Sequence, residues 1–322
     1  MSVIVRSFAK INLGLRIGPS RPDGFHQLLT VYQTIGLHDV LRISVKRGSG
    51  IEIQCDDPRV PRDESNTCFR IAEKVMNALR AQGRVVIEID KRLPVQGGLG
   101  GASANAVATL LGLERALRKP LSAAEKLRIS EEVGSDLPLF LIGGAILGVG
   151  RGEQVFPLPD FPAMRCVVVT PEVGVSTPKA FAEWDRIQGK LTVLSVSDRM
   201  NELGRELSAW LSELYSSAPS GLVARRGRAG NPLLALVRAG IENDFEEVVF
   251  PEYPELGEAK RALMRAGAKY ASLSGSGSTL YGLFGARPAA LLAVTRLRKA
   301  GWAAQVTSTL TRVAYWRRVY GS

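Results

Sequence analysis

The stretch LPVQGGLGGASANA, residues 93–106, holds four glycines, several small residues and a proline. Apolar residues then recur at helical spacing at Val107, Leu110, Leu111 and Leu117, which predicts a helix that begins near Ser103. Glycines let the backbone come close to a ligand, and the first turn of a helix offers unpaired N–H groups and a positive dipole end. The stretch therefore predicts a loop that wraps an anion such as phosphate.

This loop differs from the two common phosphate loops. It has no lysine of the Walker A type, and Ser103 stands where a dinucleotide fingerprint would place its third glycine. By itself it could also be a turn with packing glycines. Two further features favour phosphate binding: a second small-residue loop within SLSGSGSTLYGLF (272–284), and an isolated lysine, Lys10, in the strand pattern FAKINLGL (8–15).

A carboxylate stands before an apolar run in VGSDLPLF, residues 133–140. Asp136 could be the N-cap of a helix that starts at Pro138, because proline is favoured at the first helical position. It could also be a functional carboxylate held near a lysine, since a buried carboxylate needs a partner. The spacing of the residues leaves both interpretations open.

Composition narrows the class of protein. A chain of 322 residues with 45% hydrophobic and 23% charged residues is typical of a globular enzyme. The three cysteines are far apart and predict neither zinc binding nor disulfides, and two histidines make a Ser-His-Asp hydrolase improbable. We find no secretory signal and no apolar run of membrane-spanning length, so a cytoplasmic protein without a membrane partner is expected.

The formal net charge of +11 has several interpretations. It could indicate nucleic-acid binding, an enzyme for phosphorylated substrates, or a generally basic surface. The basic residues cluster only at RRGR (225–228) and YWRR (315–318), and no nucleic-acid motif accompanies them. We therefore expect no nucleic-acid partner.

Hydrophobic periodicity predicts an α+β chain. Alternation predicts strands over 9–17, 40–46, 50–55 and 84–90, and further strands are expected over 164–170, as a buried strand, and over 279–285 and 302–309. Helices are expected between Ser65 or Asn66 as the cap and Gly83, from the Ser122–Glu125 capping box, and over 254–267 and 288–300. The later elements favour a ferredoxin-like layer. Residues 188–232 are unclear, apart from an expected exposed loop over 218–232. A Gly- and Pro-rich boundary near 150–163 divides the chain into domains 1–155 and 156–322.

The three glycine- and lysine-containing segments, FAKINLGL, LPVQGGLGGASANA and SLSGSGSTLYGLF, resemble the three motifs of the GHMP kinases. Three more segments resemble the branch of that family that acts on a cytidine-diphosphate-linked methylerythritol: RPDGFHQLLTVYQTIGLHD (21–39), VGSDLPLF and NDFEEVVFPEYPEL (243–256). The resemblance runs from about Arg6 to Gly285. It implies a two-domain α+β GHMP kinase fold, with a ferredoxin-like C-terminal domain and the active site in the cleft.

The resemblance implies ATP-dependent phosphorylation of that substrate's 2-hydroxyl, in the non-mevalonate route to isoprenoid precursors. The implied catalytic pair is Lys10 and Asp136. The positions implied for ATP are Asn66, Lys91, Pro94, Gly97, Gly98, Leu99, Gly100, Gly101, Ala102 and Ser103. Those implied for the second substrate are Asn12, Phe25, His26, Thr177, Pro178, Phe181, Ser274 and Gly275. Magnesium is expected with ATP; Ser103 is the best candidate ligand, and the metal site is otherwise unknown. A monomer or weak homodimer is expected.

This sequence departs from the family pattern at Gln96, Ala102 and Ala104 in the glycine loop, and at Phe25, where the branch has tyrosine. Gln and Ala still supply backbone amides, so the phosphate loop is expected to be intact. Two alternatives stay open: another GHMP kinase, for homoserine or mevalonate, and a non-catalytic relative that binds nucleotide or nucleic acid. RPDGFH (21–26) and STPKAF (176–181) argue against the first, and the retained Lys10 and Asp136 against the second.

Overall fold

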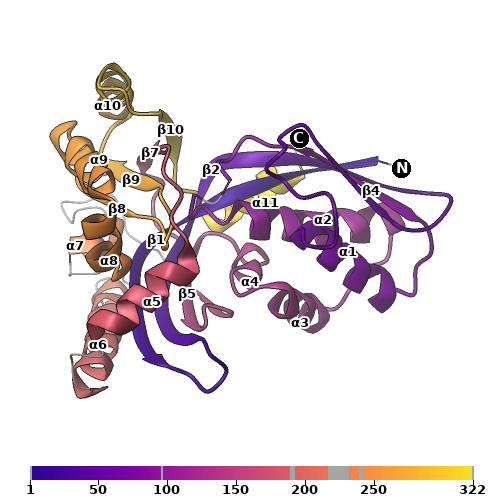
Figure 1. The fold of residues 1–322 in the computed structure, drawn as a ribbon, viewed down its shortest axis with the longest axis horizontal. Helices are drawn as coiled ribbons and strands as arrows, with labels where there is room; N and C mark the ends of the chain where they lie inside the picture. Colours follow the sequence, from indigo (N-terminus) through magenta and orange to yellow (C-terminus); the bar gives the residue numbers. More distant parts are fainter. Residues whose placement is uncertain (1, 96, 189–192, 217–231, 239–241, 321–322) are drawn as a thin grey trace.

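The computed structural model describes residues 2–95, 97–188, 193–216, 232–238 and 242–320. Gln96, the basic cluster 225–228 and nearly all of the loop expected over 218–232 lie outside this described part. Two β-sheets form the framework, and the long strands β1 (Ser2–Ser20) and β2 (His26–Lys46) run between the two halves of the molecule (Figure 1).

The first sheet is six-stranded. It has the order β3-β4-β2-β5-β6, with β1 antiparallel to β2; the further strands are β3 (Ile51–Cys55), β4 (Arg84–Asp90), β5 (Ala145–Gly150) and β6 (Gln154–Pro157). This half also contains α1 (Thr67–Ala78), α2 (Gly101–Leu117), α3 (Ala123–Val133) and the short α4 (Leu137–Phe140). Helix α2 contacts both β1 and β2.

The second sheet confirms the predicted ferredoxin-like layer. Its order is β10-β7-β9-β8 and every pairing is antiparallel; the strands are β7 (Arg165–Val169), β8 (Tyr270–Leu273), β9 (Leu280–Phe284) and β10 (Ala304–Ser308). Helices α9 (Pro254–Arg265) and α10 (Arg287–Lys299) contact this sheet. The remaining helices are α5 (Thr177–Gln188), α6 (Val193–Ser216), α7 (Pro232–Arg238), α8 (Phe245–Glu252) and α11 (Arg312–Val319).

Local capping explains where several helices begin and end. The Ser122–Glu125 capping box is present, and Asn66, rather than Ser65, caps α1 by accepting from the Cys68 amide. Helix α1 ends at Ala78, before the expected stop at Gly83, because Arg80 already adopts a positive φ of 46°. Helix α2 begins at Gly101, two residues earlier than predicted.

The C-terminal segment after Thr311 fits no motif, and the structure gives it a packing role. In helix α11 the Tyr315 hydroxyl donates to the Phe140 carbonyl at 2.7 Å, and Trp316 Nε1 donates to the Ile142 carbonyl at 3.0 Å. Tyr315 and Val319 join the buried cluster between α2 and the first sheet. The chain thus returns to its first half, and the division into 1–155 and 156–322 stays a prediction.

The three cysteines are buried and form no disulfide. Burial raises the pKa of the Cys68 thiol to about 12, which makes it unreactive as a nucleophile. Among the helices of the described part, none is both long and apolar enough to traverse a lipid bilayer.

Candidate active site

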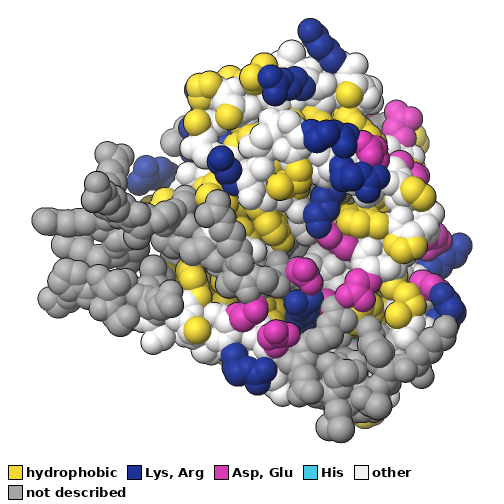
Figure 2. Space-filling view, turned by 90° about the vertical axis from the view of Figure 1, so that its left-hand side faces the viewer, with side chains coloured by type: hydrophobic (Ala, Val, Ile, Leu, Met, Phe, Trp, Pro, Cys, Tyr) yellow, Lys and Arg dark blue, Asp and Glu magenta, His cyan; other side chains and the backbone are white. Residues whose placement is uncertain are grey.

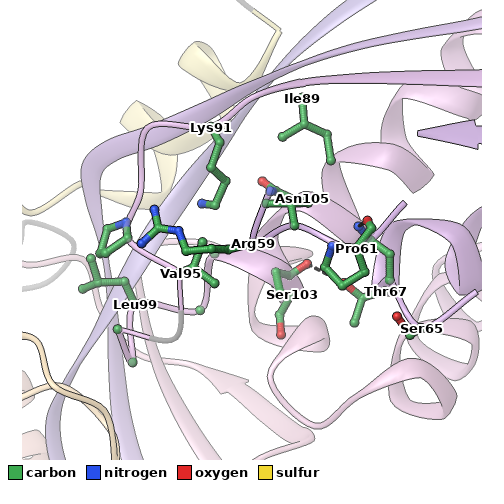
Figure 3. A pocket seen from close by; sticks show the side chains of 18 residues that line it. Arg59, Pro61, Ser65, Thr67, Ile89, Lys91, Val95, Leu99, Ser103 and Asn105 are labelled. Carbon is green, nitrogen blue, oxygen red and sulfur yellow. Dashed lines mark hydrogen bonds between the residues drawn. The ribbon is translucent and has the colours of Figure 1, made fainter. Parts of the chain in front are cut away.

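One cavity, of about 370 Å³, lies against the glycine loop and the start of α2 (Figure 3). All ten positions that the resemblance assigns to ATP line it: Asn66, Lys91, Pro94, Gly97, Gly98, Leu99, Gly100, Gly101, Ala102 and Ser103. The backbone of one continuous segment therefore makes much of its wall. Such a wall offers amide donors close to a bound anion.

The conformation of the loop requires glycine at two positions. Gly98 and Gly100 have φ angles of +77° and +69°, a region that glycine enters without penalty. A Cβ added to Gly98 would lie 2.0 Å from the carbonyl oxygen of Ser274. Gly100 is the N-cap of α2 and supplies no side-chain cap to the helix. The first-turn amides of α2 are thus left for a ligand.

A second cavity, of about 730 Å³, adjoins the first, since Gly98 and Gly100 line both. Its wall includes most positions that the resemblance assigns to catalysis and to the second substrate: Lys10, Asn12, Phe25, His26, Asp136, Thr177, Pro178, Phe181 and Gly275. Side chains from β1, β2 and α5 meet here with Asp136, which stands just before α4. A group transferred between the two cavities would pass the backbone of Gly98 and Gly100.

Lys10 and Asp136 lie together at this junction. Lys10 is 4% exposed, and its Nζ lies 3.4 Å from Asp136 Oδ2 and 2.7 Å from Asn12 Oδ1. Irregular pairing of β1 with β2 on both sides of this segment, between Phe8 and Lys10 and between Asn12 and Gly14, accompanies this arrangement. The Lys10 backbone N–H donates to the Leu99 carbonyl at 2.9 Å, which ties the strand to the glycine loop.

Asp136 precedes α4, but its side chain makes no capping hydrogen bond. Its carboxylate instead faces Lys10 and accepts from the Tyr32 hydroxyl at 3.1 Å. Of the two interpretations that the sequence left open, the geometry favours the carboxylate held near a lysine. About a third of the Asp136 side chain stays exposed, so a substrate hydroxyl can reach it.

Tyr32 is a site residue that sequence reasoning missed. It lies opposite Asn12 in the β1–β2 pairing and is 2% exposed. Burial raises the pKa of its phenol well above the ordinary value, and the nearby Asp136 carboxylate adds to that shift. Tyr32 therefore remains protonated and donates to Asp136. Tyr32 and Asp136 lie 104 positions apart in the chain, so no local sequence signal indicates this hydrogen bond.

The outer end of the second cavity is aromatic. The His26 and Phe181 rings stack with centroids 4.8 Å apart and planes 11° apart, and Phe181 meets Phe245 edge to face at 4.9 Å. His26 Nε2 lies 2.7 Å from Asp185 Oδ1. Phe25 is 48% exposed, with the Arg151 guanidinium 4.8 Å from its ring centroid. One face of the Phe181 ring is thus already covered by the His26 imidazole.

Ser274 corrects one sequence expectation. It is fully buried, does not line the second cavity, and donates through Oγ to the Gly98 carbonyl at 3.0 Å. This hydrogen bond links the two small-residue loops. The loops can approach so closely because Gly98 and Gly277 have no side chains between their backbones. Ser274 therefore shapes the site without facing a substrate.

The segment NDFE, residues 243–246, supports the site from behind. Asn243 Nδ2 donates to the carbonyls of Leu273 and Gly275 at 3.0 and 2.8 Å. Glu246 accepts from the Ser272 hydroxyl and the Leu273 amide. The sequence marked this segment as part of a motif but assigned it no role; the side chains of Asn243 and Glu246 hold the second small-residue loop in place.

Comparison with known proteins gives a consistent result. Residues 66–144 match the family described as GHMP kinases N terminal domain, and residues 228–301 match GHMP kinases C terminal. The 4-diphosphocytidyl-2-C-methyl-D-erythritol kinase of Solibacter usitatus is 40% identical over 98% of this chain and 92% of its own length. The protein of the same name from Acaryochloris marina is 35% identical over 91% of this chain and 90% of its own length.

Solved structures agree at the level of the fold. A crystal structure of 4-(cytidine 5'-diphospho)-2C-methyl-D-erythritol kinase superposes with a TM-score of 0.70 at 26% identity, covering 95% of this chain and 98% of that one. Homoserine kinase from Cytophaga hutchinsonii gives a TM-score of 0.67 at 21% identity, over 96% and 95% of the two chains. That second likeness concerns the fold alone.

Proposed function

This chain belongs to the GHMP kinases, in the branch of the 4-diphosphocytidyl-2-C-methyl-D-erythritol kinases, and on that premise we propose the residues and substrate of its reaction. It is an ATP-dependent small-molecule kinase. The acceptor in our proposal is the 2-hydroxyl of 4-diphosphocytidyl-2-C-methyl-D-erythritol, an intermediate on the non-mevalonate route to isoprenoid precursors. The single observation that most supports this assignment is the Lys10–Asp136 pair at the junction of the two cavities.

The proposed chemistry is in-line phosphoryl transfer from ATP. The substrate hydroxyl oxygen attacks the terminal phosphorus of ATP, and the bond from that phosphorus to the ADP oxygen breaks. Asp136 Oδ2 accepts the proton of this hydroxyl or orients the hydroxyl for attack. Lys10, whose Nζ lies 3.4 Å from the Asp136 carboxylate, offsets the negative charge that develops on the transferred group. Asn12 and Tyr32 hold Lys10 and Asp136 in place through hydrogen bonds.

ATP would occupy the cavity along the glycine loop. The first-turn amides of α2 and the amides of Gly97 to Gly101 would receive the phosphates, and Lys91 and Asn66 lie further along the same wall (Figure 3). Asn66 already uses its amide to bond with the Pro61 carbonyl and the Cys68 amide. It would therefore act as a rigid part of the adenosine wall.

Magnesium would neutralise the phosphates of ATP. Within the described residues no group of three or more His, Cys, Asp or Glu side chains could hold a metal ion. Magnesium in kinases keeps waters and phosphate oxygens as ligands and needs few protein groups. The half-buried hydroxyl of Ser103 faces the ATP cavity at the first turn of α2 and fits that limited role.

The size and lining of the second cavity favour a nucleotide-linked substrate over homoserine or mevalonate. Its volume of about 730 Å³ is larger than homoserine or mevalonate requires. At its aromatic end, a planar base can stack against the rings of Phe25, His26 and Phe181. Thr177 and Pro178 begin α5 at the same wall. We propose the cytosine at this end and the erythritol hydroxyl at Asp136.

A nucleic-acid-binding role has less support. Figure 2 shows lysines and arginines interspersed with acidic and apolar side chains on the face it draws, without a uniformly basic surface among its described residues. The partners in our proposal are ATP and the small-molecule substrate, for a cytoplasmic enzyme that is a monomer or weak homodimer.

One assay tests the proposal. Purified protein is incubated with ATP, magnesium and, in parallel, the cytidyl-linked methylerythritol, homoserine and mevalonate, and ADP release is followed. We expect turnover with the cytidyl compound and phosphorus NMR signals of a new phosphate ester on its 2-hydroxyl. Turnover with homoserine or mevalonate alone would place the chain in another branch, and ADP release with none of the three would refute the proposal.

A further inference from the structure

Asp39 is a fully buried carboxylate on β2 that lines neither cavity. It is the last residue of the segment 21–39. Its Oδ1 accepts from the backbone amides of Arg92 and Leu93, each at 2.7 Å. Its Oδ2 accepts from Lys91 Nζ at 2.7 Å and from Asn105 Nδ2 at 3.0 Å. One side chain of the sheet thus holds four donors.

These donors flank the glycine loop on both sides. Residues 91–93 lead from β4 into the loop, and Asn105 lies near the start of α2, which follows the loop. A buried carboxylate is costly unless it is paired and fully hydrogen-bonded. Asp39 meets that requirement only when the two ends of the loop occupy their present positions, so the sheet fixes the span of the loop.

Two of the donors also line the ATP cavity: Lys91 and Asn105 (Figure 3). A Cβ built on Gly101 would lie 3.4 Å from Lys91 Nζ, so the ammonium stands at the first turn of α2. A lysine side chain is flexible, and its ion pair with Asp39 restricts the ammonium to this place. Asn105 is oriented too, because a carboxylate only accepts and therefore selects the Nδ2 end of the amide.

We propose that Asp39 is a positioning residue for ATP. It touches no nucleotide; it fixes the Lys91 ammonium, the Asn105 amide and the entry to the glycine loop before ATP arrives. The inference rests on the proposed function of that cavity. It predicts that loss of the carboxylate weakens ATP binding while the cytidyl substrate is bound as before.

Asp39→Asn tests this with little change of shape. The new carbonyl can still accept from the amides of residues 92 and 93, but its NH2 group faces two donors, Lys91 Nζ and Asn105 Nδ2. Loss of hydrogen bonds to a charged group predicts that the Kd for ATP rises about 10- to 150-fold. The KM for the cytidyl substrate is expected to stay within about 2-fold of wild type.

The exchange Asp39→Asn with Asn105→Asp provides the rescue. In this double variant the side-chain amide at position 39 donates to the carboxylate at position 105, and that carboxylate again lies beside Lys91. We expect the double variant to bind ATP at least about 5-fold more tightly than Asp39→Asn, because every donor regains an acceptor. A role in overall stability alone predicts no such recovery of affinity.

The matched control is Asp244→Asn. Asp244 is 1% exposed and also binds one cation and one amide, Arg16 Nη1 at 2.7 Å and the Ile17 N–H at 2.8 Å, away from the ATP cavity. It is expected to lower the melting temperature and leave the Kd for ATP unchanged.

Calorimetric titration of each folded variant with ATP, without the second substrate, measures the affinity. Unchanged ATP affinity in folded Asp39→Asn overturns the inference, and so does an equal loss for the control. If Asp39→Asn does not fold, the double variant decides: recovery of folding and ATP binding supports the inference, and failure of either overturns it. Wild-type protein that binds ATP but phosphorylates none of the three acceptors would refute the proposed function while leaving this test intact.

Discussion

The two cavities are built by different means. The proposed ATP cavity includes in its wall one continuous glycine-rich segment, Gly97 to Ser103. The substrate cavity is walled by side chains that β1, β2, α5 and the turn before α4 bring together, such as Lys10, Tyr32, Asp136 and Phe181. The first presents amides whose positions depend on backbone conformation; the second presents functional groups whose positions depend on packing.

This difference decides which changes each cavity tolerates. Side chains in the loop can vary, as at Ala102 and Ala104, provided that the backbone keeps its course. In the substrate cavity the backbone can be intact while the removal of a single group abolishes a function. Substitutions of both kinds can therefore test the contrast.

The largest effect is expected from Asp136→Asn. The amide keeps the shape of the carboxylate but cannot take the proton of the substrate hydroxyl, so kcat should fall by about 10²- to 10⁴-fold. The KM for ATP should change little, because Asp136 lines only the substrate cavity. Steady-state kinetics of the folded variant measure both quantities.

The control for this variant is Glu132→Gln on α3, an exposed carboxylate paired with Lys74 and Arg128 outside both cavities. It should keep wild-type kinetics. Near-normal kcat in Asp136→Asn would show that this carboxylate is not the base and return it to a structural role at the start of α4.

The substitution Gly98→Ala should distort the glycine loop that lines the proposed ATP cavity. The new Cβ would lie 2.0 Å from the Ser274 carbonyl, and the φ of +77° adds strain. A loop displaced to relieve both should lose ATP affinity on the order of 100-fold. The matched control is Gly101→Ala, whose Cβ would meet nothing closer than 3.4 Å. Equal ATP affinities in the two folded variants, by calorimetry, would contradict this account.

The same contrast explains how much the sequence could predict. The glycine loop was recognisable because its determinants, Gly98, Gly100 and the apolar spacing after Ser103, are contiguous. Strand alternation and capping residues likewise predicted β1, β4, α3 and the ferredoxin-like layer, because those signals are local. The start of α2 and the end of α1 were misplaced, since the left-handed φ angles at Gly100 and Arg80 set these termini.

The substrate cavity could be predicted only through the family resemblance. Nothing local shows that Tyr32 faces Asp136, that Asp39 holds Lys91, or that Asn243 holds the second small-residue loop. Each of these contacts joins residues at least 30 positions apart in the chain. Ser274 was assigned to the substrate for the same reason: the sequence cannot tell whether a loop hydroxyl faces a cavity or a neighbouring loop.

A smaller effect, confined to one substrate, is expected from Phe181→Ala. Stacking of a base on an aromatic ring is worth roughly 1–3 kcal/mol, so the KM for the cytidyl substrate should rise about 5- to 150-fold. ATP parameters should stay nearly constant. The control is Phe156→Ala, which removes an exposed ring on β6 that lines neither cavity. Circular dichroism checks folding, and equal losses for both substrates would reject stacking of the cytosine on Phe181.

The smallest effect is expected from Tyr32→Phe, which removes only the hydrogen bond to Asp136. A net contribution of about 0.5–1.5 kcal/mol from this hydrogen bond predicts a 2- to 13-fold fall in kcat with both KM values unchanged.

The same substitution tests the pH dependence of stability. Burial raises the pKa of the Tyr32 phenol above its value in the unfolded chain, so the stabilisation by the protonated phenol is present below about pH 10 and is lost as the pH rises further. Between about pH 8 and pH 10.5, denaturation midpoints should therefore fall more in wild type than in the variant. A kcat as low as that of Asp136→Asn would show that Tyr32 does more than orient the carboxylate. Identical losses of stability at alkaline pH in the two proteins would show that the Tyr32 phenol does not titrate with a raised pKa.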